Sequence, residues 1–190
     1  MDMDPACTVD MKSAPKSEMV IVNAGKLENV FVYVKSGVEN YSMPQPKEPA
    51  MINQKGCRYE PHVLGVMAGQ PIKILNSDRT EHNVHAVAQN NPQWNLSQMP
   101  GAAPLEEKFN NPELMMPIVC NQHPWMKMYL NVVANPFFAV TDAQGRFTIS
   151  GLPPGDYTIE ALHERLGARE AKVHLDAKQN AQLNFSFTQQ

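Results

Sequence analysis

The chain has 190 residues, of which 43% are hydrophobic and 18% charged, a composition typical of one large or two small globular domains. Its 16 Lys and Arg against 19 Asp and Glu give a net charge of −3 without a basic run, so nucleic-acid binding has no electrostatic support. No run approaches the roughly 18 apolar residues of a membrane span. The chain as given also lacks the charged start and apolar segment of a secretory signal.

The N-terminal third is predicted to hold few strands. Residues 1–18 are polar and without a period, which favours an extended arm. The runs 19–22 and 29–34 are rich in β-branched residues and predict short strands. Residues 39–55 contain three prolines and predict an irregular connection.

The middle of the chain reads as a series of strands with one long interruption. Residues 88–111 are rich in Asn, Gln, Pro and Gly and predict a long, lid-like loop. The residues expected to anchor this loop on the core are Trp94, Leu96, Met99 and Phe109. The predicted strands around it are 63–66, 72–75, 84–88, 115–119 and 128–133.

The segment 120–126, CNQHPWM, concentrates soft metal donors in one tight loop. It carries the thiol of Cys120, the imidazole of His123 and the thioether of Met126. Soft sulfur with imidazole suits copper that changes between two oxidation states, as in trigonal His2Cys sites with a weak axial Met. The second imidazole has to come from a distant strand, where His82 and His85 are candidates. Because they lie three apart on a strand, they point to opposite faces, and at most one can face a metal.

The pattern changes near residue 135, where a second domain is predicted. Short runs at even spacing, separated by strong turn signals, favour a small antiparallel β-sandwich. We therefore expect domains at 1–134 and 135–190. The predicted strands of the second domain are 137–141, 146–149, 157–162, 171–175 and 183–187.

Two parts of the chain resemble known protein families. HNVH at 82–85 and CNQHPWM at 120–126 resemble the copper-binding segments of plastocyanin-like and amicyanin-like cupredoxins, and the matching segments cover 59–134. GRFTISGLPPGDYTIEA at 145–161 resembles the carboxypeptidase regulatory-like, transthyretin-like module. The resemblances imply an all-β chain, with a Greek-key cupredoxin sandwich followed by the small β-sandwich.

The cupredoxin resemblance also implies a ligand set. It places the first ligand at the His before Asn-Val, which is His82, and favours Met126 over Met128 as the axial ligand. One type 1 copper ion would then be held by His82, Cys120, His123 and Met126. The Asn83 backbone N–H is expected to hold the thiolate, and the Asn83 side chain to tie its strand to the loop near Asn121.

The same resemblance implies one-electron transfer between redox partners, not an enzyme, because four protein ligands leave no open position for substrate. The alternative function is a copper carrier or storage protein without redox traffic. The implied location is the periplasm. A protein redox partner, such as a cytochrome or dehydrogenase, is expected to dock where the edge of His123 reaches the surface beside Pro124, Trp125 and either Met115 or Met116.

The chain has three cysteines, so at least one of them has no disulfide partner within the chain. If Cys120 binds the metal, Cys7 and Cys57 either form a disulfide or remain as two reduced thiols, and the export implied by the resemblance favours the disulfide. His62 has a structural role or joins Cys57 and His85 in a second metal site. His163 is expected to face solvent.

Overall fold

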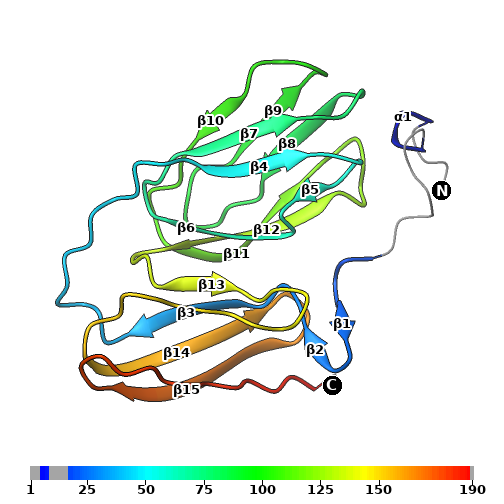
Figure 1. Ribbon diagram of the computed structural model, residues 1–190. Coiled ribbons are helices and arrows are strands. Elements are labelled where there is room, and N and C mark those ends of the chain that lie inside the picture. Colours follow the sequence, from blue (N-terminus) through cyan, green and yellow to red (C-terminus); the bar gives the residue numbers. More distant parts are fainter. Residues whose placement is uncertain (1–4, 9–16, 189–190) are drawn as a thin grey trace. The chain divides into compact units, whose positions relative to one another are not determined.

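The computed structural model describes residues 5–8 and 17–188, whose regular secondary structure is almost entirely β-strand (Figure 1). Within these ranges the only helix is α1 (Pro5–Thr8), so the expected all-β class is confirmed. No helix in the described ranges is long and apolar enough to cross a membrane. The chain divides into two compact units. One contains residues 45–134 with the N-terminal residues, and the other contains 18–44 with 135–190.

The first unit is built from two sheets (Figure 1). The four-stranded sheet has the order β10-β7-β4-β5, and the five-stranded sheet has the order β6-β12-β11-β8-β9. The pairs β4–β7 and β6–β12 are parallel, and the others are antiparallel. The strands are β4 (Ala50–Gln54), β5 (Tyr59–Glu60), β6 (Val63–Met67), β7 (Ile72–Asn76), β8 (His82–Ala86), β9 (Trp94–Gln98), β10 (Leu105–Glu107), β11 (Glu113–Val119) and β12 (Lys127–Val133).

The apolar core of this unit lies between the two sheets. Because side chains alternate between the two faces of a strand, Ile72 and Ile74 of β7 point to the same side, and they belong to the same cluster as Val84 of β8 and Ile118 of β11. Cys120 and Met126, which flank the loop after β11, belong to that cluster as well. A well-packed core therefore reaches up to the loop that carries the candidate ligands.

Two segments expected to be irregular contain strands. Residues 88–111 contain β9 and β10, and residues 39–55 end in β4. The local sequence was rich in turn formers, but pairing with neighbouring strands overrides weak local preference. Phe109 is buried and stacks on Trp94 with ring centroids 5.8 Å apart, so both are anchors, whereas Met99 is exposed.

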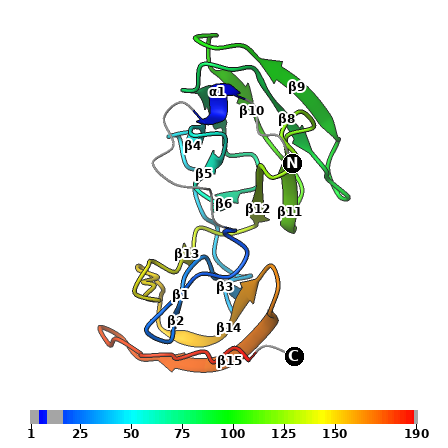
Figure 2. The ribbon, with the colours of Figure 1, turned by 90° about the vertical axis from the view of Figure 1, so that its right-hand side faces the viewer.

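The second unit contains a four-stranded sheet with the order β13-β3-β14-β15 (Figures 1 and 2). One side of this sheet packs on a separate apolar core that includes Tyr157 and Ile159. Residues 146–149 and 183–187 were expected as strands; they contribute side chains to this core but have no strand assignment. The elements are the short hairpin β1 (Val22–Asn23) and β2 (Lys26–Leu27), then β3 (Phe31–Ser36), β13 (Phe138–Val140), β14 (Gly155–His163) and β15 (Gly167–Leu175).

The division into units differs from the expected one for residues 18–44. Strand β3 pairs with β13 on one side and β14 on the other, and Val32 and Val34 join the core of the second unit. The pattern of 29–34 correctly predicted a strand, but a periodic pattern does not reveal the partner strand. His163 was expected to face solvent, but it is buried at the end of β14 and accepts a hydrogen bond from the Arg165 N–H.

Candidate metal centre

The topology of the five-stranded sheet brings the candidate ligands together. Strands β11 and β8 are antiparallel neighbours, with Val119 opposite His85. The loop that follows β11 therefore meets the beginning of β8, where His82 lies. Cys120 and His123 belong to this loop, so two candidate ligands come from one loop and the third from the adjacent strand.

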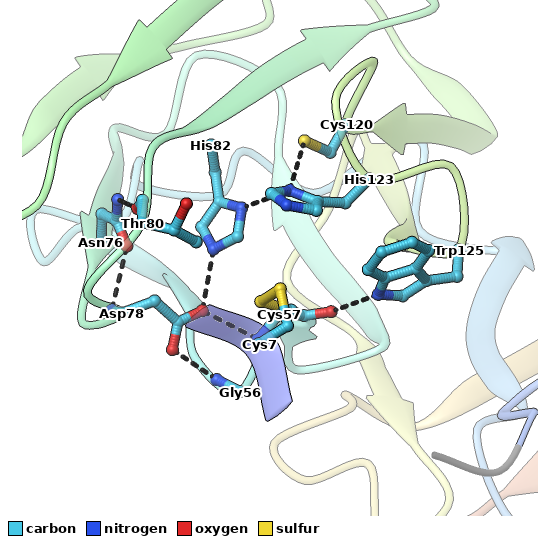
Figure 3. Close-up of a disulfide and its surroundings, with 10 residues drawn as sticks. All are labelled: Cys7, Gly56, Cys57, Asn76, Asp78, Thr80, His82, Cys120, His123 and Trp125. Carbon is cyan, nitrogen blue, oxygen red and sulfur yellow. Dashed lines mark hydrogen bonds and ion pairs between the residues drawn. A yellow bond between two sulfur atoms is a disulfide. The ribbon is translucent and has the colours of Figure 1, made fainter. Parts of the chain in front are cut away.

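The three side chains converge at one buried point (Figure 3). Nδ1 of His82 is 2.9 Å from Nδ1 of His123, and Nδ1 of His123 is 3.7 Å from Sγ of Cys120. The ligand atoms of all three lie within 4.8 Å of one another. Two imidazole nitrogens and one thiol sulfur at this spacing form a donor set that suits a soft or borderline metal ion.

Met126 closes the ligand loop through its backbone. Its N–H donates to the carbonyl of His123 at 2.8 Å, and its carbonyl accepts from the N–H of Cys120 at 3.2 Å. The side chain is buried in the core cluster that contains Cys120. Met128 is equally buried in that cluster, so burial alone does not distinguish the two thioethers.

Asn83 joins the segments that carry the candidate ligands, as the resemblance to cupredoxins implied for its side chain. Its side-chain Oδ1 accepts hydrogen bonds from the N–H of Asn121 at 2.8 Å and of Gln122 at 3.4 Å. The same Oδ1 lies 3.3 Å from the sulfur of Cys120, and the Asn83 backbone N–H helps to lower the pKa of that thiol. The amide is held in turn by Asn95, whose Oδ1 accepts from Asn83 Nδ2 at 2.6 Å. The loop is therefore fixed to β8 before any metal binds.

Asp78 orients His82 and was missed by sequence reasoning. Its Oδ2 is 2.8 Å from Nε2 of His82, which leaves Nδ1 facing Cys120 and His123. The N–H groups of Gly56 and Cys57, both at positive φ, donate to the same carboxylate at 2.6 and 2.8 Å. Carboxylates that hold the second nitrogen of a ligand histidine are a common feature of metal sites. The only sequence signal was an acidic residue four positions before His82.

Tyr59 is a second residue that the sequence did not single out for this role. It is fully buried, and its hydroxyl donates to the carbonyl of Asn83 at 2.6 Å. This hydrogen bond supports the strand segment whose N–H interacts with the Cys120 sulfur. Burial and the nearby Cys120 charge raise the pKa of Tyr59, so its hydroxyl stays a donor at neutral pH.

Charge interactions in the metal-free site favour a thiolate beside an imidazolium. Burial lowers the pKa of His82, but the hydrogen bonds to Asp78 and Cys120 outweigh it and raise the pKa to about 9. Burial raises the pKa of Cys120, but hydrogen bonds from His82, Asn83 and His123 outweigh it and lower the pKa to about 6. The lowered pKa favours the thiolate, which is the form of the sulfur that binds metals.

A thiol titration of the metal-free protein checks this charge pairing. With the Cys7–Cys57 bridge intact, Cys120 is the only thiol in the chain, and its ultraviolet thiolate absorbance is expected to titrate near pH 6. Asp78→Asn removes the carboxylate that keeps His82 protonated, so the pKa of Cys120 should rise toward the ordinary thiol value of about 8.5. Equal thiol pKa values in both proteins would contradict the pairing.

Cys7 and Cys57 form a disulfide, which confirms the expected pair. The bridge lies directly beside the candidate site: the sulfurs of Cys7 and Cys57 and a ring nitrogen of His123 are within 4.8 Å of one another. Figure 3 shows the bridge between Asp78 and Trp125. Trp125 Nε1 donates to the carbonyl of Cys57 at 3.2 Å, and its ring centroid is 5.2 Å from that of His123.

The expected surface patch at His123 needs correction. His123 is only 3% exposed and does not present a ring edge to solvent. Trp125 is partly buried and packs on the core, and Met116 is buried, whereas Pro124 is exposed. The sequence did not show that the ring of His123 lies beside Trp125 and beside the sulfurs of Cys7 and Cys57.

The suggested second metal site at His62, Cys57 and His85 does not form. Cys57 is in the disulfide and has no thiol to offer, and His62 packs edge-on against Tyr129. His85 faces the other side of β8, with its Nδ1 3.2 Å from Asn121 Oδ1. The other clusters of possible ligands in the described ranges reuse residues already discussed: Cys7, Cys57 and His123, or Cys57, Asp78 and His82.

Comparison with known proteins gave matches to both parts of the chain. The model of the carboxypeptidase regulatory-like domain matches residues 131–188, which confirms the C-terminal resemblance. A search of curated proteins found no match.

Solved structures of copper proteins resemble the chain over about half its length. A copper-containing nitrite reductase from Thermus scotoductus SA-01 is 19% identical, with 49% of this chain and 24% of that chain covered and a TM-score of 0.42. This chain thus spans about a quarter of that enzyme. A purple cupredoxin from Nitrosopumilus maritimus is 20% identical over 44% of this chain and 98% of its own, with a TM-score of 0.38. A reduced amicyanin mutant is 20% identical over 53% and 97%, with a TM-score of 0.40.

Proposed function

We propose that the first unit binds one copper ion and transfers single electrons as a type 1 copper protein. The observation that carries this proposal is the convergence of His82, Cys120 and His123, whose donor atoms lie within 4.8 Å of one another in a buried position. Two imidazoles and a thiolate, with Met126 as a weak axial donor, are the ligand set of electron-transfer copper sites. Copper would supply the change between Cu(I) and Cu(II).

The surrounding residues support electron transfer more than substrate chemistry. The ligand atoms are buried, and four protein donors leave no coordination position for a substrate. Asn83 and Asp78 hold the loop and the His82 ring by hydrogen bonds that do not involve the metal. A donor set fixed in this way changes little when the ion gains or loses an electron. We therefore propose a carrier protein and no catalytic reaction at this site.

The disulfide supports a location outside the reducing cytosol. Structural disulfides persist in secreted and periplasmic proteins and are rare where glutathione and thioredoxin keep thiols reduced. Cys7 and Cys57 are both buried, as expected for a structural bridge. We propose the periplasm, where an exported copper protein would meet a protein redox partner.

The deciding experiment is a visible spectrum after addition of Cu(II), followed by stepwise reduction. We expect an intense thiolate-to-copper band that disappears and returns with one electron per protein. In Cys120→Ala the band should be absent because the sulfur that produces it is gone. Cu(I) binding without colour, and with rapid metal release, would instead indicate the carrier or storage function, and an unchanged band in Cys120→Ala would overturn the site.

A matched pair of variants tests the axial ligand. Met126→Leu should raise the reduction potential and alter the visible spectrum, because a weak axial thioether tunes the copper. Met128→Leu replaces an equally buried thioether of β12 and should leave both quantities unchanged. Cyclic voltammetry of the two proteins makes the comparison. The opposite pattern would assign the axial position to Met128.

A further inference from the structure

Strand β15 forms an open edge of the sheet in the second unit (Figure 1). It pairs with β14 along all 9 of its residues without a register shift, and no other strand of the described ranges pairs with it. The residues that follow cover the inner face of the sheet instead, because Leu183, Phe185 and Phe187 pack against the same apolar core as Val173. A long edge strand offers a row of backbone N–H and C=O groups to another strand, and β15 has neither a proline nor a bulge to prevent such pairing.

The charges on β15 are self-complementary. Glu170 and Lys172 are exposed and lie two residues apart, so their side chains point to the same face of the sheet. Ala171 between them is the midpoint of the strand. When two β15 strands run antiparallel about this residue, Glu170 of each copy lies opposite Lys172 of the other. The arrangement has two-fold symmetry, as most contacts between identical chains do.

The charges also disfavour the neighbouring registers. Two identical strands that pair antiparallel through the same edge keep the same face of the sheet outward, so even positions meet even positions. Centring the pair on Glu170 or Lys172 would set a charged side chain opposite its own copy, and like charges in that position destabilise a pair of strands. The register about Ala171 therefore combines the longest overlap with opposite charges at both flanking positions.

Within one copy the charges of this face are unevenly paired. Glu160 of β14 lies opposite Glu170 of β15, and Lys35 forms ion pairs with both carboxylates. Two negative groups thus share one ammonium group. Lys172 is exposed, and in the described part of the chain its side chain has no hydrogen bond or ion pair. Lys172 of a second copy would supply the missing positive charge at Glu170.

We propose that β15 is a docking edge for a second copy of this chain, with the two β15 strands antiparallel about Ala171 and their sheets joined into one. Backbone hydrogen bonds hold the strands together, and the two Glu170–Lys172 pairs determine the register. An interface of this kind is small, so we expect reversible association. It involves residues of the second unit alone and does not rest on the proposed copper site.

Sedimentation equilibrium of the full chain over a range of concentrations is the test, with two single variants designed as a pair. Glu170→Lys makes positions 170 and 172 both positive, and Lys172→Glu makes both negative. Each variant repels its own copy, so its dissociation constant should rise about tenfold or more. An equal mixture of the two variants restores opposite charges at both positions and should associate as the native chain does. Lys108→Glu repeats the charge change at an exposed position of the first unit and should behave as the native chain.

The proposal is overturned if the native chain keeps the mass of a single copy at millimolar concentration. It is equally overturned if Lys172→Glu associates as tightly as the native chain, or if the mixture associates no better than either variant alone. Association should be the same with and without added copper. A failure of copper to bind would therefore count only against the proposed function.

Discussion

Replacing His82 with alanine is expected to abolish the proposed copper site, whereas the same change at His85 should leave it intact. Both histidines belong to β8, but His82 is fully buried with Nδ1 directed at His123, and His85 faces Asn121 on the other side. Loss of an outer partner of a metal ligand costs about 10- to 100-fold in affinity, so loss of the ligand itself should cost more. Copper titration with visible spectroscopy measures the difference.

The pair also separates ligand loss from general damage. His82→Ala leaves the Asp78 carboxylate without its imidazole, but Asp78 still accepts from the N–H groups of Gly56 and Cys57. The variant should therefore fold, and its far-ultraviolet circular dichroism should match that of His85→Ala. Equal copper affinity in the two variants would exclude His82 as a ligand. If the thiolate-to-copper band were lost only in His85→Ala, His85 and not His82 would be the copper ligand.

Loss of the Cys7–Cys57 bridge is expected to destabilise the first unit by about 4 kcal/mol. The bridged cysteines are 50 residues apart, and closing a loop of that length in the unfolded chain accounts for a free energy of this size. Both tryptophans of the chain, Trp94 and Trp125, lie in the first unit. Their fluorescence therefore reports the urea unfolding of that unit without a signal from the other.

The control for this measurement is the reductant itself. A phosphine added to native protein should lower the free energy of unfolding as much as Cys7→Ala/Cys57→Ala does. The same phosphine should have no effect on the variant, which has no bridge to reduce. A bridge-free protein as stable as the native one would show that the arm is held to the unit without its covalent link.

The loop motif could be recognised from sequence because its donors are local. Cys120, His123 and Met126 lie within seven residues, and a short loop restricts where their side chains can go. The parity of a strand shows that His82 and His85 face opposite sides, so at most one can face a metal, and the resemblance to cupredoxins favoured His82. The structure places His82 with the loop donors and His85 on the other face.

The features that sequence reasoning missed depend on contacts between distant segments. Asp78 has no motif, and its role follows from a turn that brings Gly56 and Cys57 to its carboxylate. The burial of His123 involves residues distant in sequence, because Nδ1 of His82 is 2.9 Å from its Nδ1 and the sulfurs of Cys7 and Cys57 lie within 4.8 Å of a ring nitrogen. Strand β3 looked like any half-buried strand, and only its pairing with β13 and β14 assigns it to the second unit. Local sequence patterns indicate which segments form strands, whereas pairing between distant segments determines which sheet each strand joins.

The pairing of β3 also affects the order in which the protein can be assembled during synthesis. Residues 45–134 are nested inside the sequence of the other unit, so the two sheets of the first unit are complete once residue 134 has been made. At that moment β3 has already been synthesised, but neither β13 nor β14 yet exists to pair with it. A valine-rich strand with two open edges is prone to pair with other chains. Truncation after residue 134 should therefore yield a folded but aggregation-prone protein, and removal of 18–44 as well should restore its solubility.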